Sequence, residues 1–100
     1  MKVTPYHRIV IKLGTNLLSA DTGQLDPKIM ASLVEQVVHL HHQGLEPVIV
    51  SSGAIAAGRH KLGLSDEHKD IPFRQVLASV GQGYLLRIYE ELFGQHHITV

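Results

Sequence analysis

The chain has 100 residues, 44% of them hydrophobic, and its nine Lys and Arg residues balance nine Asp and Glu residues. This size and composition suit one small domain with its own core, and the neutral balance argues against a nucleic-acid-binding surface. The absence of cysteine excludes disulfides, thiolate metal sites and cysteine nucleophiles.

The first eight residues carry charge and a proline but no long apolar stretch, so they do not resemble a secretory signal. No run of about eighteen apolar residues occurs, so no membrane span and a cytoplasmic location are expected. The segment from Arg8 to Leu13 is rich in β-branched residues, which predicts a strand covered on both faces, as in a parallel sheet. Gly14 ends this strand, and a polar loop is expected as far as Gly23.

A helix is predicted after Asp26, which can cap it, because Pro27 tolerates the first helical position. Gly44 is well placed to close this helix. Its predicted apolar face comprises Ile29, Leu33, Val37 and Leu40. Pro47 leads into a second buried strand over residues 48–50, which completes a right-handed strand–helix–strand unit.

Two further helices are predicted, over Ala54 to Leu62 and about Phe73 to Phe93, with a charged loop over residues 64–71 between them. Gly81 and Gly83 lie inside the second of these helices, where they indicate either a kink or plain tolerance, or close backbone approach to another element. Residues 98–100 are typical of the start of a third strand. The predicted apolar face of the long helix comprises Phe73, Leu77, Val80, Tyr84, Ile88 and Leu92.

The order of these elements predicts an α/β fold, a parallel sheet flanked by helices in three α/β/α layers, incomplete at the carboxyl terminus. Residues 1–100 are expected to form the amino-terminal part of a single domain, with no second domain present.

Lys12 is unusual because it interrupts a strand of isoleucine, valine and leucine. Its stem could pack while the ammonium group reaches solvent, or the strand could lie at a sheet edge. Alternatively, the ammonium group lies at the mouth of a parallel sheet, where such folds bind ligands. Gly14 then permits close backbone approach to a phosphate, and Thr15 and Asn16 add polar groups at the same rim.

Ser51, Ser52, Gly53 and Ala54 directly follow the second strand and begin a helix. Hydroxyl groups and free helix N–H groups can bind a carboxylate or phosphate, although serine at this position is also an ordinary helix cap. Because both polar segments follow neighbouring strands, we expect them to face one crevice.

Two other patterns do not predict a site. Residues 53–60 have P-loop spacing, but Arg59 and His60 replace the lysine and hydroxyl residue that a P-loop requires, and the interior favours a helix. Among the eight histidines, His39 with His42 and His96 with His97 lack an accompanying carboxylate pattern, so exposed histidines are the preferred interpretation and no metal site is assigned.

The segment Ile11-Lys12-Leu13-Gly14-Thr15 resembles the opening lysine–glycine motif of the amino acid kinase family. Residues 50–58, Val-Ser-Ser-Gly-Ala-Ile-Ala-Ala-Gly, are similar to the serine–glycine segment of the glutamate 5-kinase subfamily, and residues 75–82 and 89–93 are similar to its long helix. Asn16 departs from the serine expected in that subfamily.

The resemblance implies transfer of the ATP γ-phosphate to the side-chain carboxylate of L-glutamate, the first step of proline biosynthesis. Lys12 would contact the ATP phosphates and stabilise charge, Gly14 and Thr15 would shape the phosphate rim, and Mg²⁺ would bridge the phosphates. Ser52, Gly53 and Ala54 would hold glutamate. A homo-oligomer is expected of the longer protein.

The resemblance also implies that other substrate- and nucleotide-binding residues and a second catalytic lysine follow residue 100, so the 100 residues alone would be inactive. Two alternatives stay open. The chain could be a non-catalytic ligand-binding or subunit-interaction module, or part of a sibling kinase acting on N-acetylglutamate or aspartate.

Overall fold

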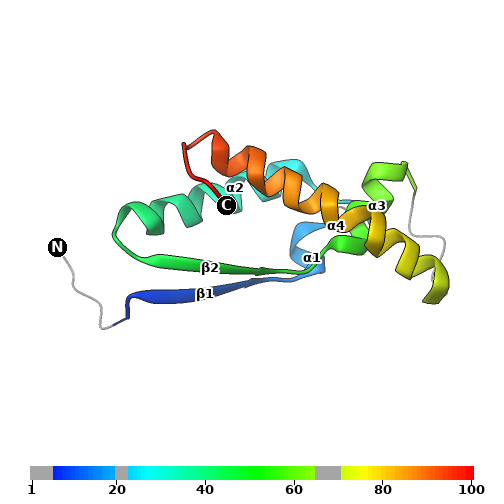
Figure 1. Ribbon diagram of the computed structural model, residues 1–100, viewed down its shortest axis with the longest axis horizontal. Coiled ribbons are helices and arrows are strands. Elements are labelled where there is room, and N and C mark those ends of the chain that lie inside the picture. The colour runs from blue at the N-terminus through cyan, green and yellow to red at the C-terminus, as the bar shows by residue number, and fades with distance from the viewer. Residues whose placement is uncertain (1–5, 20–22, 65–70) are drawn as a thin grey trace.

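The chain is described here from a computed structural model, which defines residues 6–19, 23–64 and 71–100. In chain order the elements are β1 (Arg8–Leu13), α1 (Thr15–Leu18), α2 (Pro27–His42), β2 (Glu46–Ser51), α3 (Ala54–Leu62) and α4 (Ile71–Gly94). β1 and β2 pair in parallel, and α2 and α4 both lie over one face of this pair (Figure 1). The predicted α/β class with a parallel sheet is therefore confirmed.

The two strands are covered on one face only. Ile11 and Ile49 pack against the core, whereas Val10, Val48 and Val50 are 64%, 41% and 49% exposed. The expectation of burial on both faces is therefore wrong for the described residues. The helices α2 and α4 lie over the face that carries Ile11 and Ile49, and no described helix covers the opposite face.

Local sequence signals determine the ends of α2. The Asp26 carboxylate accepts hydrogen bonds from the N–H groups of Lys28 and Ile29 at 2.9 and 3.4 Å, which satisfies donors that have no partner within the helix. At the other end Gly44 has a φ of 91°, the left-handed conformation that favours glycine after a helix. Both predicted helix signals are confirmed.

The contact between α3 and α4 depends on two glycines. A Cβ atom added at Gly58 would overlap the carbonyl oxygen of Leu77, and one added at Gly81 would overlap that of Ala54. At Gly83, an added Cβ would meet nothing within 4 Å. Of the two interpretations of these helix glycines, close backbone approach therefore applies to Gly81, and plain tolerance applies to Gly83.

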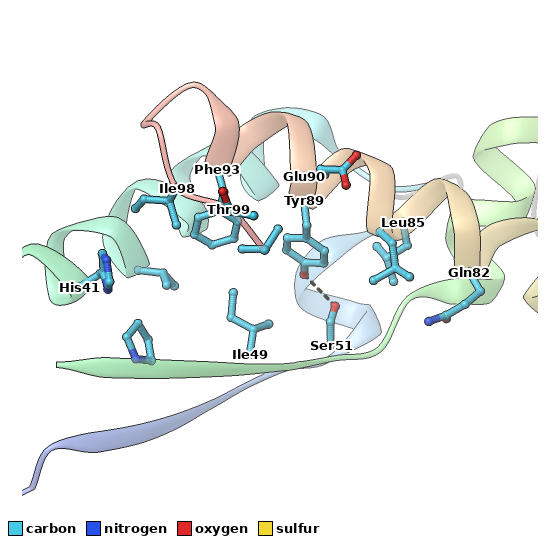
Figure 2. A pocket seen from close by; sticks show the side chains of 14 residues that line it. His41, Ile49, Ser51, Gln82, Leu85, Tyr89, Glu90, Phe93, Ile98 and Thr99 are labelled. Carbon is cyan, nitrogen blue, oxygen red and sulfur yellow. Dashed lines mark hydrogen bonds between the residues drawn. The ribbon is translucent and has the colours of Figure 1, made fainter.

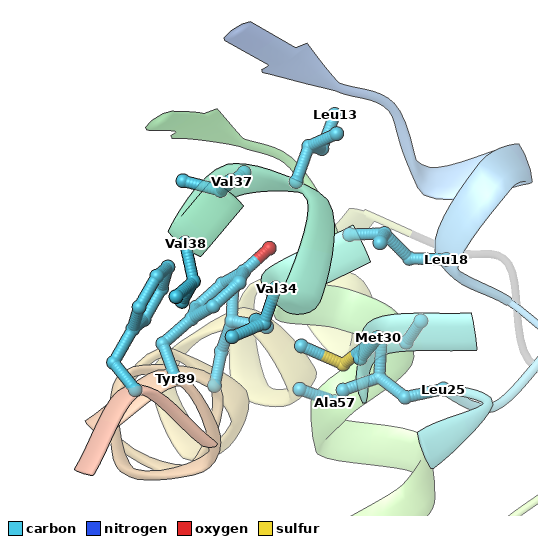
Figure 3. Packing of buried hydrophobic residues seen from close by; sticks show 12 residues of the cluster. Leu13, Leu18, Leu25, Met30, Val34, Val37, Val38, Ala57 and Tyr89 are labelled. Carbon is cyan, nitrogen blue, oxygen red and sulfur yellow. The ribbon is translucent and has the colours of Figure 1, made fainter. Parts of the chain in front are cut away.

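The core lies between the helices and the inner face of the strands (Figure 3). In α2 the buried residues are Met30, Val34, Val37 and Val38, and in α4 they include Leu77, Leu85, Tyr89 and Phe93. Val80, expected on the buried face of α4, is 37% exposed. The predicted bounds of the helices agree closely with the observed ones. Most of the residues that were expected on the buried faces, however, are only partly buried and flank the buried residues.

Two short segments differ from the sequence predictions. Residues 15–18 form the helix α1 instead of a loop, and the core buries Leu18. Residues 98–100 follow a turn and are not in a strand; the N–H group of Ile98 instead bonds to the carbonyl of Phe93 at 3.1 Å. Most of the predicted 64–71 loop lies outside the described residues. Within the described ranges, no helix is long and apolar enough to cross a membrane.

Candidate functional site

The two polar segments singled out in the sequence meet at one end of the sheet, which we call the carboxyl edge and define as residues 12–16 and 51–54. In the parallel register Lys12 lies opposite Val50 and Leu13 lies opposite Ser51. The N–H group of Ser52 then donates to the carbonyl of Leu13 at 2.8 Å, so the pairing continues just beyond β2. This arrangement places the expected phosphate and substrate segments side by side.

Lys12 is exposed on the uncovered face of the sheet, because Leu13 and Ile11 face inward from the same strand. Its neighbours on that face are Val10 and Val50. No carboxylate in the described parts of the chain forms an ion pair with Lys12. The ammonium group is therefore placed where it could reach a ligand at the carboxyl edge, but it also satisfies the simpler interpretation of a lysine that reaches solvent.

Gly14 connects β1 to α1 in an extended conformation, with φ −81° and ψ 160°. Any residue can adopt these angles, and a Cβ atom added there would meet nothing within 4 Å. The fold of the described residues therefore does not itself require glycine at this position. Thr15 begins α1 and is exposed, as is Asn16.

The turn from β2 into α3 is shaped by Gly53, which has a φ of 105°. This left-handed conformation is strained for residues with a side chain, and the glycine is buried beside Leu18 and Leu25. No side chain caps the N-terminus of α3. The first N–H groups of α3, which begins at Ala54, are thus left for an acceptor outside the helix, and the expected role of Ser51 or Ser52 as a conventional cap is not observed.

Ser51 instead faces the interior, a feature that sequence reasoning missed. Its Oγ lies 2.7 Å from Oη of Tyr89 on α4 (Figure 2). The same Oγ also donates to the carbonyl of Ser52 at 2.8 Å. Strand alternation could have indicated this, because Pro47 and Ile49 precede Ser51 on the half-buried side of β2. The partner on α4 could not be inferred from local pattern.

A cavity of about 650 Å³ lies between β2, α2, α4 and the last three residues. Ser51 and Tyr89 contribute polar groups to a lining that is otherwise largely apolar, including Ile49, Leu85 and Phe93 (Figure 2). Burial raises the pKa of Tyr89 above its usual value of 10.0, although the hydrogen bond with Ser51 acts in the opposite direction. The phenol therefore keeps its proton at neutral pH.

Comparison with known proteins identifies the family. Residues 7–100 match the amino acid kinase family. The chain is 56% identical over 95 residues to a glutamate 5-kinase of Dehalococcoides mccartyi, with 95% of this chain and 26% of that protein covered. It is 46% identical over 93 residues to the glutamate 5-kinase of Citrifermentans bemidjiense, covering 93% of this chain and 25% of the relative. The glutamate 5-kinase of Aquifex aeolicus is 43% identical over 93 residues, with 93% and 26% covered.

The chain thus spans about a quarter of the length of these curated relatives. The family match extends from the residue before β1 to the end of the chain and includes both segments of the carboxyl edge. This chain belongs to the amino acid kinase family.

Proposed function

We propose that this chain provides part of the active site of a glutamate 5-kinase, which transfers the γ-phosphoryl group of ATP to the side-chain carboxylate of L-glutamate. One observation supports this most strongly. The segment that resembles the family motif and the segment that resembles the subfamily motif end neighbouring parallel strands, with Leu13 opposite Ser51. Ligands of open parallel sheets bind outside the carboxyl ends of the strands. Glutamate is the proposed substrate because the relatives are named glutamate 5-kinase.

On the nucleotide side, Lys12 would place its ammonium group against the ATP phosphates. A fixed cation stabilises negative charge that spreads over the moving phosphoryl group, and this is the main help a protein can give to such a transfer. Thr15 would offer hydroxyl and N–H donors beside it. Glycine at position 14 would be explained by close approach of a phosphate to the backbone, since the described residues do not otherwise require it.

On the acceptor side, Ser52, Gly53 and Ala54 would hold glutamate. Ser52 is exposed and offers a hydroxyl group, while the N–H groups at the uncapped start of α3 favour an anionic ligand. A glutamate side-chain oxygen would then form a bond to the γ-phosphorus as the bond from that phosphorus to the β–γ bridging oxygen breaks. ADP leaves with that oxygen, and the product is glutamyl 5-phosphate.

Mg²⁺ belongs to this proposal as a partner of the nucleotide. The carboxyl edge contains hydroxyl, amide and ammonium groups but no carboxylate, which is the protein ligand that Mg²⁺ usually takes. We therefore assign none of these residues to the ion. When bound to ATP, Mg²⁺ would neutralise phosphate charge.

The wider context is part of the same proposal. Residues 1–100 would belong to a single amino acid kinase domain of a cytoplasmic, homo-oligomeric enzyme of proline biosynthesis. Light scattering of the purified intact protein tests the oligomeric state, since a monomer at micromolar concentration contradicts it.

The substrate is tested by trapping the acyl phosphate with hydroxylamine, using the intact protein. Hydroxamate is expected to form only when ATP and glutamate are both present. Aspartate and N-acetylglutamate should give none. If hydroxamate forms with aspartate or N-acetylglutamate but not with glutamate, the protein is a sibling kinase. If no hydroxamate forms with any of the three compounds, a non-catalytic module is favoured.

The role of Lys12 is tested by Lys12→Ala in the same assay. Loss of a charge-stabilising group at the reacting phosphate predicts a fall in turnover of about 100-fold or more. The melting temperature should change little, because the side chain is exposed. Lys28→Ala, at an exposed position on α2, is the matched control and should retain full turnover. Equal turnover in both variants would remove Lys12 from the mechanism.

A further inference from the structure

Ser51 links α4 to the turn that precedes α3 through two hydrogen bonds. Its Oγ donates to the Ser52 carbonyl at 2.8 Å and lies 2.7 Å from Oη of Tyr89. A serine hydroxyl carries one hydrogen, and here that hydrogen points to the carbonyl. The phenol must therefore be the donor in the second bond, and the order is Tyr89 to Ser51 to the carbonyl of Ser52.

The donor end of this relay is held firmly in place. Tyr89 is 7% exposed, belongs to the 24-residue helix α4 and stacks on Phe93 with 6.4 Å between ring centroids. Figure 2 shows its hydroxyl group directed at Ser51 from across the cavity. A tyrosine has few side-chain torsions, so a ring packed in this way presents its hydroxyl group at a nearly fixed point.

The acceptor end determines the direction of an N–H group. The carbonyl of Ser52 and the N–H of Gly53 belong to one planar peptide unit, and the described peptide bonds include no cis form. In a trans peptide these two groups point in opposite directions. A carbonyl held toward the Ser51 hydroxyl group therefore turns the N–H group of Gly53 away from that hydroxyl group. Backbone hydrogen bonds flank this peptide, from the N–H of Ser52 to the carbonyl of Leu13 and from the N–H of Ala57 to the carbonyl of Gly53, both at 2.8 Å. The carbonyl of the peptide itself is held by Ser51, and glycine at position 53 would allow the peptide to tilt if that bond were lost.

We propose that Tyr89 is a positioning residue for the glutamate site, an inference that rests on the proposed function. Through Ser51, its phenol fixes the Ser52–Gly53 peptide so that the Gly53 N–H is preorganised to donate to a carboxylate of the substrate. Preorganised donors bind an anion without a reorganisation cost. The relay from Tyr89 leads to the segment proposed to hold glutamate and not to Lys12 or Thr15, so its removal should separate the two substrates kinetically.

The kinetic test compares Tyr89→Phe with Tyr84→Phe in the intact protein. Tyr84 lies on the same helix but packs on the ring of His60 and beside the ammonium group of Lys61, away from the relay. Tyr89→Phe should raise the KM for glutamate about fivefold, the usual effect of one neutral hydrogen bond, and leave the KM for ATP unchanged. Tyr84→Phe should change neither constant. An unchanged KM for glutamate in Tyr89→Phe, or equal changes for both substrates, overturns the proposal.

A double-mutant cycle tests whether the effect passes through Ser51. Ser51→Ala should raise the KM for glutamate at least as much as Tyr89→Phe, and adding Tyr89→Phe to Ser51→Ala should change it little further. Effects that multiply in the double variant would mean that the two residues act independently, and would contradict the relay.

A spectroscopic test does not depend on which substrate the protein uses. Carbonyl-¹³C serine combined with ¹⁵N glycine selects serine–glycine peptides in an NMR spectrum, and Ser52–Gly53 is the one such pair in the 100 residues. In the intact protein its signal is identified as the one that Ser52→Ala removes. Tyr89→Phe should shift both nuclei, and Tyr84→Phe should shift neither. A signal that Tyr89→Phe leaves in place overturns the positioning role, even if glutamate is the substrate. A shift in a protein that fails to phosphorylate glutamate would leave the relay intact and refute the proposed function alone.

Discussion

Replacing Gly81 by alanine tests the contact between α3 and α4 and, through it, the placement of the carboxyl edge. A Cβ atom at this position would overlap the Ala54 carbonyl oxygen and lie 2.5 Å from the backbone nitrogen of Gly58, whereas ordinary contact begins at 3.4 Å. All of these neighbours are backbone atoms, so no side chain can turn aside to make room. The two helices would have to separate.

The size of the effect follows from two opposing terms. Alanine in a helix is favoured over glycine by about 1 kcal/mol, and overpacking a tight contact costs about 1–3 kcal/mol or more. Because the clash at Gly81 involves backbone on both helices, we expect the upper end of this range and a net loss of about 2 kcal/mol in the free energy of unfolding. In a domain of about 100 residues that loss would lower the melting temperature by about 10 °C, and in a domain about twice as large by about 4–8 °C.

Gly83→Ala provides a matched control on the same helix. Its added Cβ meets nothing within 4 Å, so the gain in helix propensity acts alone and the variant should be more stable by up to about 1 kcal/mol. Thermal unfolding followed by circular dichroism at 222 nm measures both variants against the parent protein. Equal stability of Gly81→Ala and Gly83→Ala would refute the inference of direct backbone contact.

Two further predictions concern other parts of the fold. Asp26→Ala should lower the free energy of unfolding by about 1 kcal/mol, because α2 loses its cap, while Glu35→Ala at an exposed position of the same helix should change it by less than about 0.5 kcal/mol; equal effects in denaturant titrations would contradict the capping role. The hydrogen bond from Arg8 and the charges of His7 and Arg8 lower the pKa of Glu46 below its usual 4.5, so its contribution to stability is present above that pH and is lost as the pH falls through the lowered pKa. The stability difference between the parent protein and Glu46→Gln should therefore shrink as the pH falls below 4.5, and a difference independent of pH would exclude the ion pair as its cause.

Local signals made several elements predictable from sequence. Asp26 followed by Pro27 marks the start of α2, because the Asp26 carboxylate accepts hydrogen bonds from the first N–H groups of the helix. Gly44 follows its end, because glycine readily adopts the left-handed conformation found there. Both signals act within a few residues of the helix end. The order of elements was enough to predict that β1 and β2 run in parallel. Since parallel strands end on the same side of a sheet, the side-by-side placement of the segments that follow β1 and β2 could also be anticipated.

Features that depend on distant contacts could not be predicted in the same way. The buried faces of α2 and α4 are rotated relative to the expected ones, because the direction from which a neighbouring helix packs decides which margin of an apolar stripe is buried. Val34, for example, is buried beside positions that were expected to carry the contact. The bond between Ser51 and Tyr89 joins residues 38 positions apart. No local pattern marks such a pair.

The most direct test of the account follows the oxygen atoms of the acceptor. The intact protein is supplied with ATP and with glutamate that carries ¹⁸O in its side-chain carboxylate, and hydroxylamine then displaces phosphate from the acyl carbon of the product. If the carboxylate attacks the γ-phosphorus, the released phosphate must carry one ¹⁸O atom, which ³¹P NMR detects as an isotope shift. Phosphate that accumulates with ADP but contains no ¹⁸O would show that the carboxylate is not the acceptor, and would contradict the proposed function of the carboxyl edge.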